Sequence, residues 1–175
     1  MNNNDRLVRL RYALDIKDVE MVELFKLGEL DMTKEEVQQL LTKIKAKQNQ
    51  EDDEGYSVNE YMKKCKNTVL ESFLNGLIIF KRGRQEVKPG EPTKKAEVMM
   101  RNDQSVNNVL LKKLKIALSL TSEDILEILD ETGVHLSKSE LSAVLRREGQ
   151  RNYKECGDRY ARNFLKGLAI RYRND

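Results

Sequence analysis

Residues 73–77 of the chain read FLNGL, and residues 164–168 read FLKGL. The chain has only nine glycines among 175 residues, so a glycine inside the same apolar pentapeptide twice points to an internal repeat. The match continues outward at the same offset of 91 residues, since Cys65 corresponds to Cys156 and Ile79 to Ile170. We infer that one structural unit was duplicated, which decides the fold before any single helix is assigned.

The first part of each half also matches, at an offset of 104 residues that aligns residues 4–41 with 108–145. Identical residues, most of the apolar ones at helical spacing, are Asn4/Asn108, Leu7/Leu111, Leu10/Leu114, Ala13/Ala117, Leu14/Leu118, Glu23/Glu127, Lys34/Lys138, Glu36/Glu140 and Leu41/Leu145. Because the two offsets differ by 13 residues, the first copy carries an insertion near residues 43–56. Its acidic part, QEDDEG at residues 50–55, is typical of a solvated loop.

The repeats define the domain organisation of the chain. We expect a first helical repeat at residues 1–81, a linker at 82–106 and a second helical repeat at 107–175. The linker holds both prolines of the chain, Pro89 and Pro92. Proline cannot continue a helix, so this stretch is expected to be an extended, exposed connector.

Composition favours an all-α fold with about four helices in each repeat. Charged residues make up 35% and aromatic residues 6% of the chain, which contains no Trp, a profile richer in helix than in sheet. No apolar run approaches the ~20 residues that a membrane span needs, and the first residues lack a signal-peptide pattern. Two cysteines without a disulfide-rich pattern are typical of a reducing compartment. We therefore expect a cytoplasmic protein that has no membrane segment.

Helix starts can be predicted from capping residues. Asn4 and Asn108 are expected to cap the first helix of each copy. Thr33 with Glu36, and Ser137 with Glu140, each fit a capping box, in which hydroxyl and carboxylate satisfy free backbone N–H groups. These two boxes predict a helix start at the same point of both repeats.

The last helix of each repeat carries the opening pentapeptide. Apolar residues recur there every four positions, which predicts one continuous ridge along each helix. Glycine within a helix costs about 1 kcal/mol relative to alanine, so close approach of a neighbouring helix is the favoured reason for it, and fraying of the helix the alternative. The structural residues of this contact are Phe73, Gly76, Leu77, Phe164, Gly167 and Leu168.

Several stretches in combination resemble the YehS-type proteins, a bacterial family defined by a domain of unknown function. They are RYALD (11–15), FLNGLIIFKRG (73–83), NNVLLKKLKIALSL (107–120) and NYKECGDRYARNFLKGL (152–168). The resemblance implies a duplicated, mainly helical cytosolic protein, and it implies no activity, ligand or catalytic residue. The lengthened segment after Leu41 departs from the family pattern.

Enzyme chemistry finds little support in the sequence. The one histidine, His135, lies in a short connector and is interpreted as a surface residue. Phosphate-loop, dinucleotide-binding, nucleophile-elbow and H-E-x-x-H strings are all missing. Cys65 and Cys156 occupy the apolar ridge, where a small buried thiol fits better than a metal ligand. We expect no catalytic residue, no metal and no cofactor.

Nucleic-acid binding is one of two hypotheses for the function. Residues 124–148 follow the outline of a helix-turn-helix, with Gly133 in the turn. Glu140, Glu35 and Glu36 would repel phosphate, as would the net charge of −4 over residues 1–54, where nine Lys/Arg face thirteen Asp/Glu. The candidate macromolecule-binding residues are Lys138, Ser142, Arg146, Arg147, Arg151, Arg159 and Arg162.

A protein-interaction or regulatory module is the preferred hypothesis. Residues 146–173 hold nine Lys/Arg against three Asp/Glu, a net charge of +6. The two repeats are expected to pack as a pseudo-symmetric pair with these basic residues beside a groove. The alternative is that the charges only keep the last helix soluble.

Overall fold

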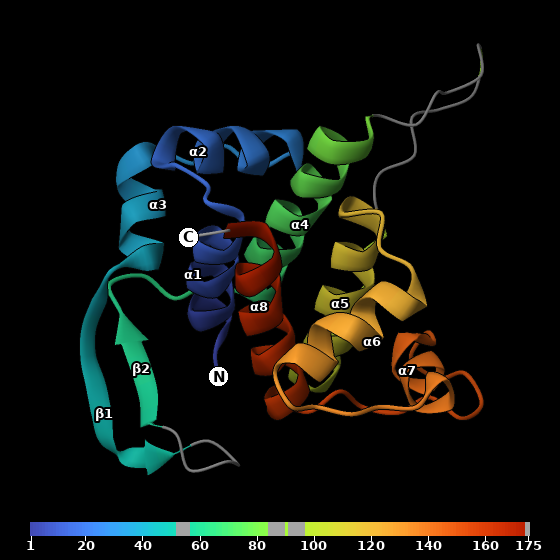
Figure 1. The fold of residues 1–175 in the computed structure, drawn as a ribbon. Coiled ribbons are helices and arrows are strands. Elements are labelled where there is room, and N and C mark those ends of the chain that lie inside the picture. Colours follow the sequence, from blue (N-terminus) through green and yellow to red (C-terminus); the bar gives the residue numbers. More distant parts are fainter. Residues whose placement is uncertain (52–56, 84–89, 91–96, 174–175) are drawn as a thin grey trace.

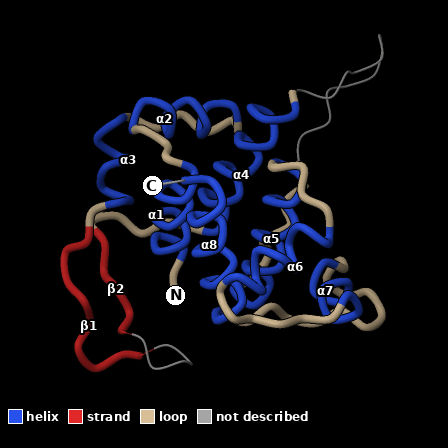
Figure 2. Tube along the Cα trace, in the orientation of Figure 1, coloured by secondary structure: helices blue, strands red, loops and turns tan. Residues whose placement is uncertain are grey.

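The computed structural model describes residues 1–51, 57–83, 90 and 97–173. The expected all-α fold with four helices in each repeat is confirmed, apart from one small hairpin (Figures 1 and 2). The helices of the first repeat are α1 (Asn3–Leu14), α2 (Asp18–Leu27), α3 (Lys34–Leu41) and α4 (Asn67–Arg82). Those of the second repeat are α5 (Val106–Ala117), α6 (Ser122–Glu131), α7 (Lys138–Leu145) and α8 (Asp158–Arg173), with a short 3-10 turn, η1 (Asp103–Ser105), before α5.

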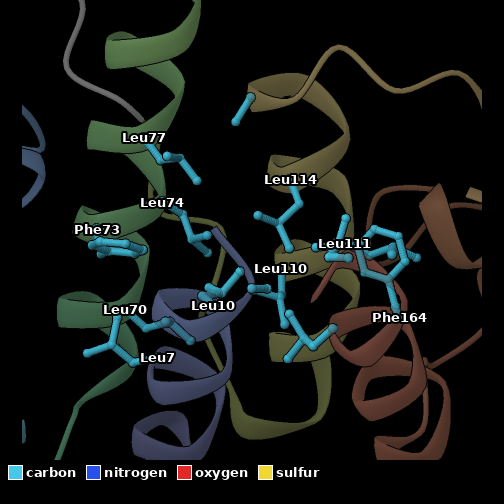
Figure 3. Packing of buried hydrophobic residues seen from close by; sticks show 14 of the residues in the cluster. Leu7, Leu10, Leu70, Phe73, Leu74, Leu77, Leu110, Leu111, Leu114 and Phe164 are labelled. Carbon is cyan, nitrogen blue, oxygen red and sulfur yellow. The ribbon is translucent and has the colours of Figure 1, made fainter. Parts of the chain in front are cut away.

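The two repeats pack directly against each other. Helix α1 of the first repeat lies on α8 of the second, and α4 of the first lies on α5 of the second. Polar contacts near the starts of α1 and α8 (Arg6 to Asp158) and near their ends (Arg173 to Tyr12) show that these two helices are parallel. Buried leucines from α1, α4 and α5 meet Phe164 of α8 in one apolar cluster (Figure 3). The hydrophobic core is therefore shared between the repeats.

Glycine allows two pairs of helices to cross at backbone distance. A Cβ atom added to Gly76 of α4 would lie 1.7 Å from the carbonyl oxygen of Leu24 in α2, and one added to Gly28 would lie 1.8 Å from that of Ser72. In the second repeat a Cβ on Gly167 would lie 2.6 Å from the carbonyl oxygen of Ile128. This is the close approach that the repeated pentapeptide predicts. Gly28, the second glycine of the first crossing, was not predicted.

The capping boxes at Thr33 and Ser137 are present, but the predicted caps Asn4 and Asn108 are wrong. Asn2 caps α1, and the backbone enters α5 through η1. Asn4 is buried and its amide instead donates to the carbonyls of Leu40 (2.8 Å) and Lys63 (2.7 Å) and accepts from Cys65 N (2.9 Å). Asn108 makes the same three bonds to Val144, Lys154 and Cys156. The two amides were conserved between the copies as tertiary links, which a capping rule does not recognise.

The insertion of the first repeat contains a β-hairpin that was not predicted, and of the acidic stretch expected as a solvated loop only Gln50 and Glu51 are described, both in a strand. β1 (Lys43–Glu51) pairs antiparallel with β2 (Ser57–Tyr61), and residues 52–56 between them lie outside the described residues. Asp5 holds β2 to the start of α1, because its Oδ1 accepts from Tyr61 Oη (2.6 Å) and Asn59 Nδ2 (3.0 Å). Lysine alternates with apolar residues from 43 to 47, a pattern that indicates a strand and that the acidic stretch after it made easy to miss.

No described helix has both the length and the apolar character needed to span a membrane.

The glycine crossings generate a test of stability. Gly76→Ala forces the backbones of α2 and α4 apart, so we expect a loss of about 3 kcal/mol in the free energy of unfolding, at the upper end of overpacking costs. Gly167→Ala is the matched change in the other crossing, where part of the clash falls on the Ile128 side chain, and it should cost less. Urea denaturation of both variants measures the difference. Equal or increased stability of Gly76→Ala would show that the crossing is not tight.

Candidate binding site

The predicted site residues divide between three places. Arg146 and Arg147 line one pocket at the end of α7, and the carbonyl of Arg151 accepts from Arg146 Nη1 (3.1 Å) beside it. Lys138 and Ser142 are exposed on α7. Arg159 and Arg162 lie on α8, the first exposed and the second half-buried. The structure thus brings only the arginines around the end of α7 together.

We call the cavity beside the end of α7 the basic pocket. It encloses about 270 Å³ between the segment that enters η1, the first turns of α5 and the chain that follows α7. The cationic residues that line it are Arg101, Lys112, Arg146 and Arg147, against the carboxylates Glu97 and Glu148. Val98, 53% exposed, and Tyr153 also line it. The pocket therefore combines a net positive charge with apolar surface.

Only some of the charged side chains of the pocket form ion pairs within the described part of the protein. Glu97 Oε1 contacts both Arg147 and Arg101, the latter at 3.5 Å. Glu148 accepts from Asn102 Nδ2 (2.8 Å), not from an arginine. Within the described part of the chain, Lys112 and Arg146 form no ion pair, so two of the four cations remain available to an external anion.

A buried carboxylate positions the segment that carries Glu97. Glu71 of α4 accepts hydrogen bonds from the backbone N–H groups of Met99 (2.9 Å to its Oε2) and Met100 (2.9 Å to its Oε1). Lys113 of α5 lies 3.4 Å from Glu71 and donates to Asn75 at 2.6 Å. Burial lowers the pKa of Lys113, while the nearby Glu71 opposes that shift. This network holds the end of the linker between α4 and α5.

The helix-turn-helix outline, α6 and α7, presents an acidic surface. Lys138, the exposed cation of α7, pairs with Glu123 of α6 at 2.8 Å. The carboxylates exposed on α6 are Glu123, Glu127, Asp130 and Glu131. In a helix-turn-helix the first helix crosses the phosphate backbone. An acidic α6 would repel it, and α7 ends at Leu145, before the arginines begin.

A second cavity, the inter-repeat groove, lies where α1, α4, α5 and α8 begin and encloses about 910 Å³. Arg6 is buried in its wall and donates to Asn3 Oδ1 and Asn107 Oδ1, both at 2.8 Å, with Asp158 Oδ1 at 3.4 Å. Asn107 also donates to Asp158 (2.8 Å), just as Asn3 donates to Asn67 in the first repeat (2.7 Å). These polar side chains hydrogen-bond to one another and so connect the two repeats. Their hydrogen-bonding groups are therefore largely used within the protein.

Both cysteines are 2% exposed and border this groove. Burial raises the pKa of each thiol to about 12, for Cys156 with a further contribution from Asp158. A thiol that stays protonated at neutral pH is a poor nucleophile and a poor metal ligand. His135 is exposed and contacts Asp130. The described residues contain no group of three or more side chains suited to hold a metal ion.

Sequence reasoning missed Arg101 and Lys112. Arg101 stands in the linker, and Lys112 stands within an apolar helix pattern, so neither belonged to the basic C-terminal run. A comparison of the repeats offers one signal, because the first repeat has Val8 where the second has Lys112.

The fold defines a mainly helical protein made of two copies of a four-helix unit, the first with a small β-hairpin. The family model described as "Protein of unknown function (DUF1456)" matches residues 3–83 and 107–174, so the chain belongs to that family. The chain is 39% identical over 172 residues to "Uncharacterized protein YehS" of Escherichia coli (strain K12), covering 98% of this chain and 96% of that protein. No solved structure matched the chain.

The contacts of Asp158 predict a dependence of stability on pH. Burial alone would raise the pKa of Asp158, but Asn107, the amino group of Met1 and Arg6 together lower it below its ordinary 3.8. A lowered pKa in the folded state means that the stabilisation is present above the unfolded pKa and is lost as the pH falls through the folded value.

Asp158→Asn keeps an amide oxygen for Asn107, as Asn67 provides in the first repeat, but removes the charge. We expect a loss of about 1–3 kcal/mol at about pH 7, the range of charged hydrogen bonds, that shrinks toward about pH 2.5. Urea denaturation at both pH values measures it. A loss that is the same at both would exclude the charge as its cause.

Proposed function

We propose that this protein is a non-catalytic interaction module that binds an acidic segment of a partner protein in the basic pocket of its second repeat. The supporting observation is the composition of the pocket wall, where four cations face two carboxylates. Guanidinium and ammonium groups are the usual partners of carboxylates at protein interfaces. Two of these cations have no internal ion pair in the described chain.

Two observations favour a protein partner over nucleic acid. Val98 offers exposed apolar surface at the edge of the pocket, and Tyr153 lies in its wall. Protein interfaces combine such an apolar contact with a polar rim. The neighbouring α6 carries four exposed carboxylates, which would oppose an extended phosphate backbone.

The difference between the repeats supports a role for the second one. At the positions of Val109 and Lys112 on α5, the first repeat has Asp5 and Val8 on α1. The carboxylate of Asp5 accepts a hydrogen bond from the hydroxyl of Tyr61 in the hairpin. The duplication thus retained the helices, while Lys112 of the second copy faces the basic pocket at a position where the first copy has an apolar residue.

A binding measurement tests the proposal. A fluorescent octaglutamate peptide should bind the wild-type protein at low salt and dissociate as salt screens the charges. Arg146→Glu/Arg147→Glu should weaken binding by at least about ten-fold, or about 1.4 kcal/mol. The matched control, Arg159→Glu/Lys166→Glu, makes the same charge change on exposed residues of α8 outside the pocket and should have a much smaller effect.

Equal losses in the two double variants would contradict a specific pocket, and absence of peptide binding at low salt would contradict the proposal itself. A mixed-sequence duplex DNA of matched charge is the second probe. If it binds more tightly than the peptide and the pocket variant abolishes that binding, nucleic acid is the partner.

A further inference from the structure

Glu97 already contacts two of the arginines that line the basic pocket. It is the one carboxylate of the pocket wall that contacts arginine side chains in the described structure, and its Oε1 lies against both Arg101 and Arg147. Guanidinium groups are preferred partners of carboxylates, so an acidic side chain of a ligand would contact the same two arginines. A carboxylate of the protein itself therefore already pairs with two of the four cations of the basic pocket, Arg101 and Arg147.

The position of Glu97 is set by the buried network of Glu71. The hydrogen bonds of Glu71 fix the backbone at Met99 and Met100, two and three residues after Glu97. The Glu71 and Lys113 side chains are 4% and 8% exposed, whereas Glu97 is 54% exposed. The anchor is thus internal, while the carboxylate that it delivers lies at the surface.

We propose that Glu97 is an internal ligand that competes for the basic pocket, and that a carboxylate of an acidic partner segment displaces it from Arg101 and Arg147. This inference rests on the proposed function and specifies how the site is regulated. Exposed ion pairs are weak and exchange readily with solvent ions. The contact can hence be displaced by a segment that also reaches Lys112 and Arg146, which Glu97 does not neutralise.

The test compares two substitutions of equal charge. Glu97→Gln removes the carboxylate from the arginines, whereas Glu148→Gln removes one that contacts Asn102 in the same pocket. We expect Glu97→Gln to tighten octaglutamate binding by about two- to five-fold, the size of a surface ion pair, and Glu148→Gln to have a smaller effect. The gain should disappear in an Arg147→Gln background, since the freed arginine is then missing.

A second measurement does not depend on peptide binding. On a sulfonate cation-exchange column the two glutamine variants have the same net charge, so Glu97→Gln should elute at higher salt than Glu148→Gln. Equal elution and equal peptide affinity would overturn the role of Glu97, even if Arg146→Glu/Arg147→Glu still loses binding. If the peptide does not bind at all, the proposed function fails, and the column alone decides whether Glu97 covers the arginines.

Discussion

The packing of helices from one repeat against helices of the other is the constraint on which the structure depends. Because α1 lies on α8 and α4 lies on α5, the core of each repeat is completed by the other. These helices start at one end of the molecule, where the positive ends of their dipoles meet. Asp5, Asp103 and Asp158 place negative charge at that end, and Arg6 joins the amides of both repeats through it. These polar contacts between the repeats are therefore part of the fold, which explains why the buried amides of Asn3 and Asn107 bond to other residues of the protein.

The two copies differ mainly at the surface. Core positions such as Phe73 and Phe164 match because the same crossing has to be packed twice. Surface positions are free of that requirement, and there the first repeat gained a hairpin held by Asp5 while the second gained the lysine and arginines of the basic pocket. A duplicated fold thus presents two different surfaces. In the second, Lys112 and Arg146 face a cavity and form no ion pair within the described residues.

Part of the candidate site could be predicted from the sequence. Arg146 and Arg147 are adjacent in the chain and lie in a basic run, so composition alone singled them out. Arg101 and Lys112 reach the same pocket from the linker and from α5, and their proximity depends on how Glu71 fixes Met99 and Met100 between two helices. The last arginines of the run were less informative, because Arg171 binds Asp124 and Arg173 stacks on Tyr12. A local pattern of charge does not distinguish an intramolecular ion pair from a binding surface.

The sequence by itself determined the duplication, the eight helices, the starts of α3 and α7 and the glycine crossings, since periodicity, capping and the absence of a side chain act over a few neighbouring residues. It did not determine what Asn4 and Asn108 do, nor the hairpin, nor that the repeats share one core. Asparagine suits a helix cap and a buried link equally well, and only the distant carbonyls of Leu40 and Val144 decide between them. Those partners, like the walls of the basic pocket, come together only when residues far apart in the chain are packed against one another.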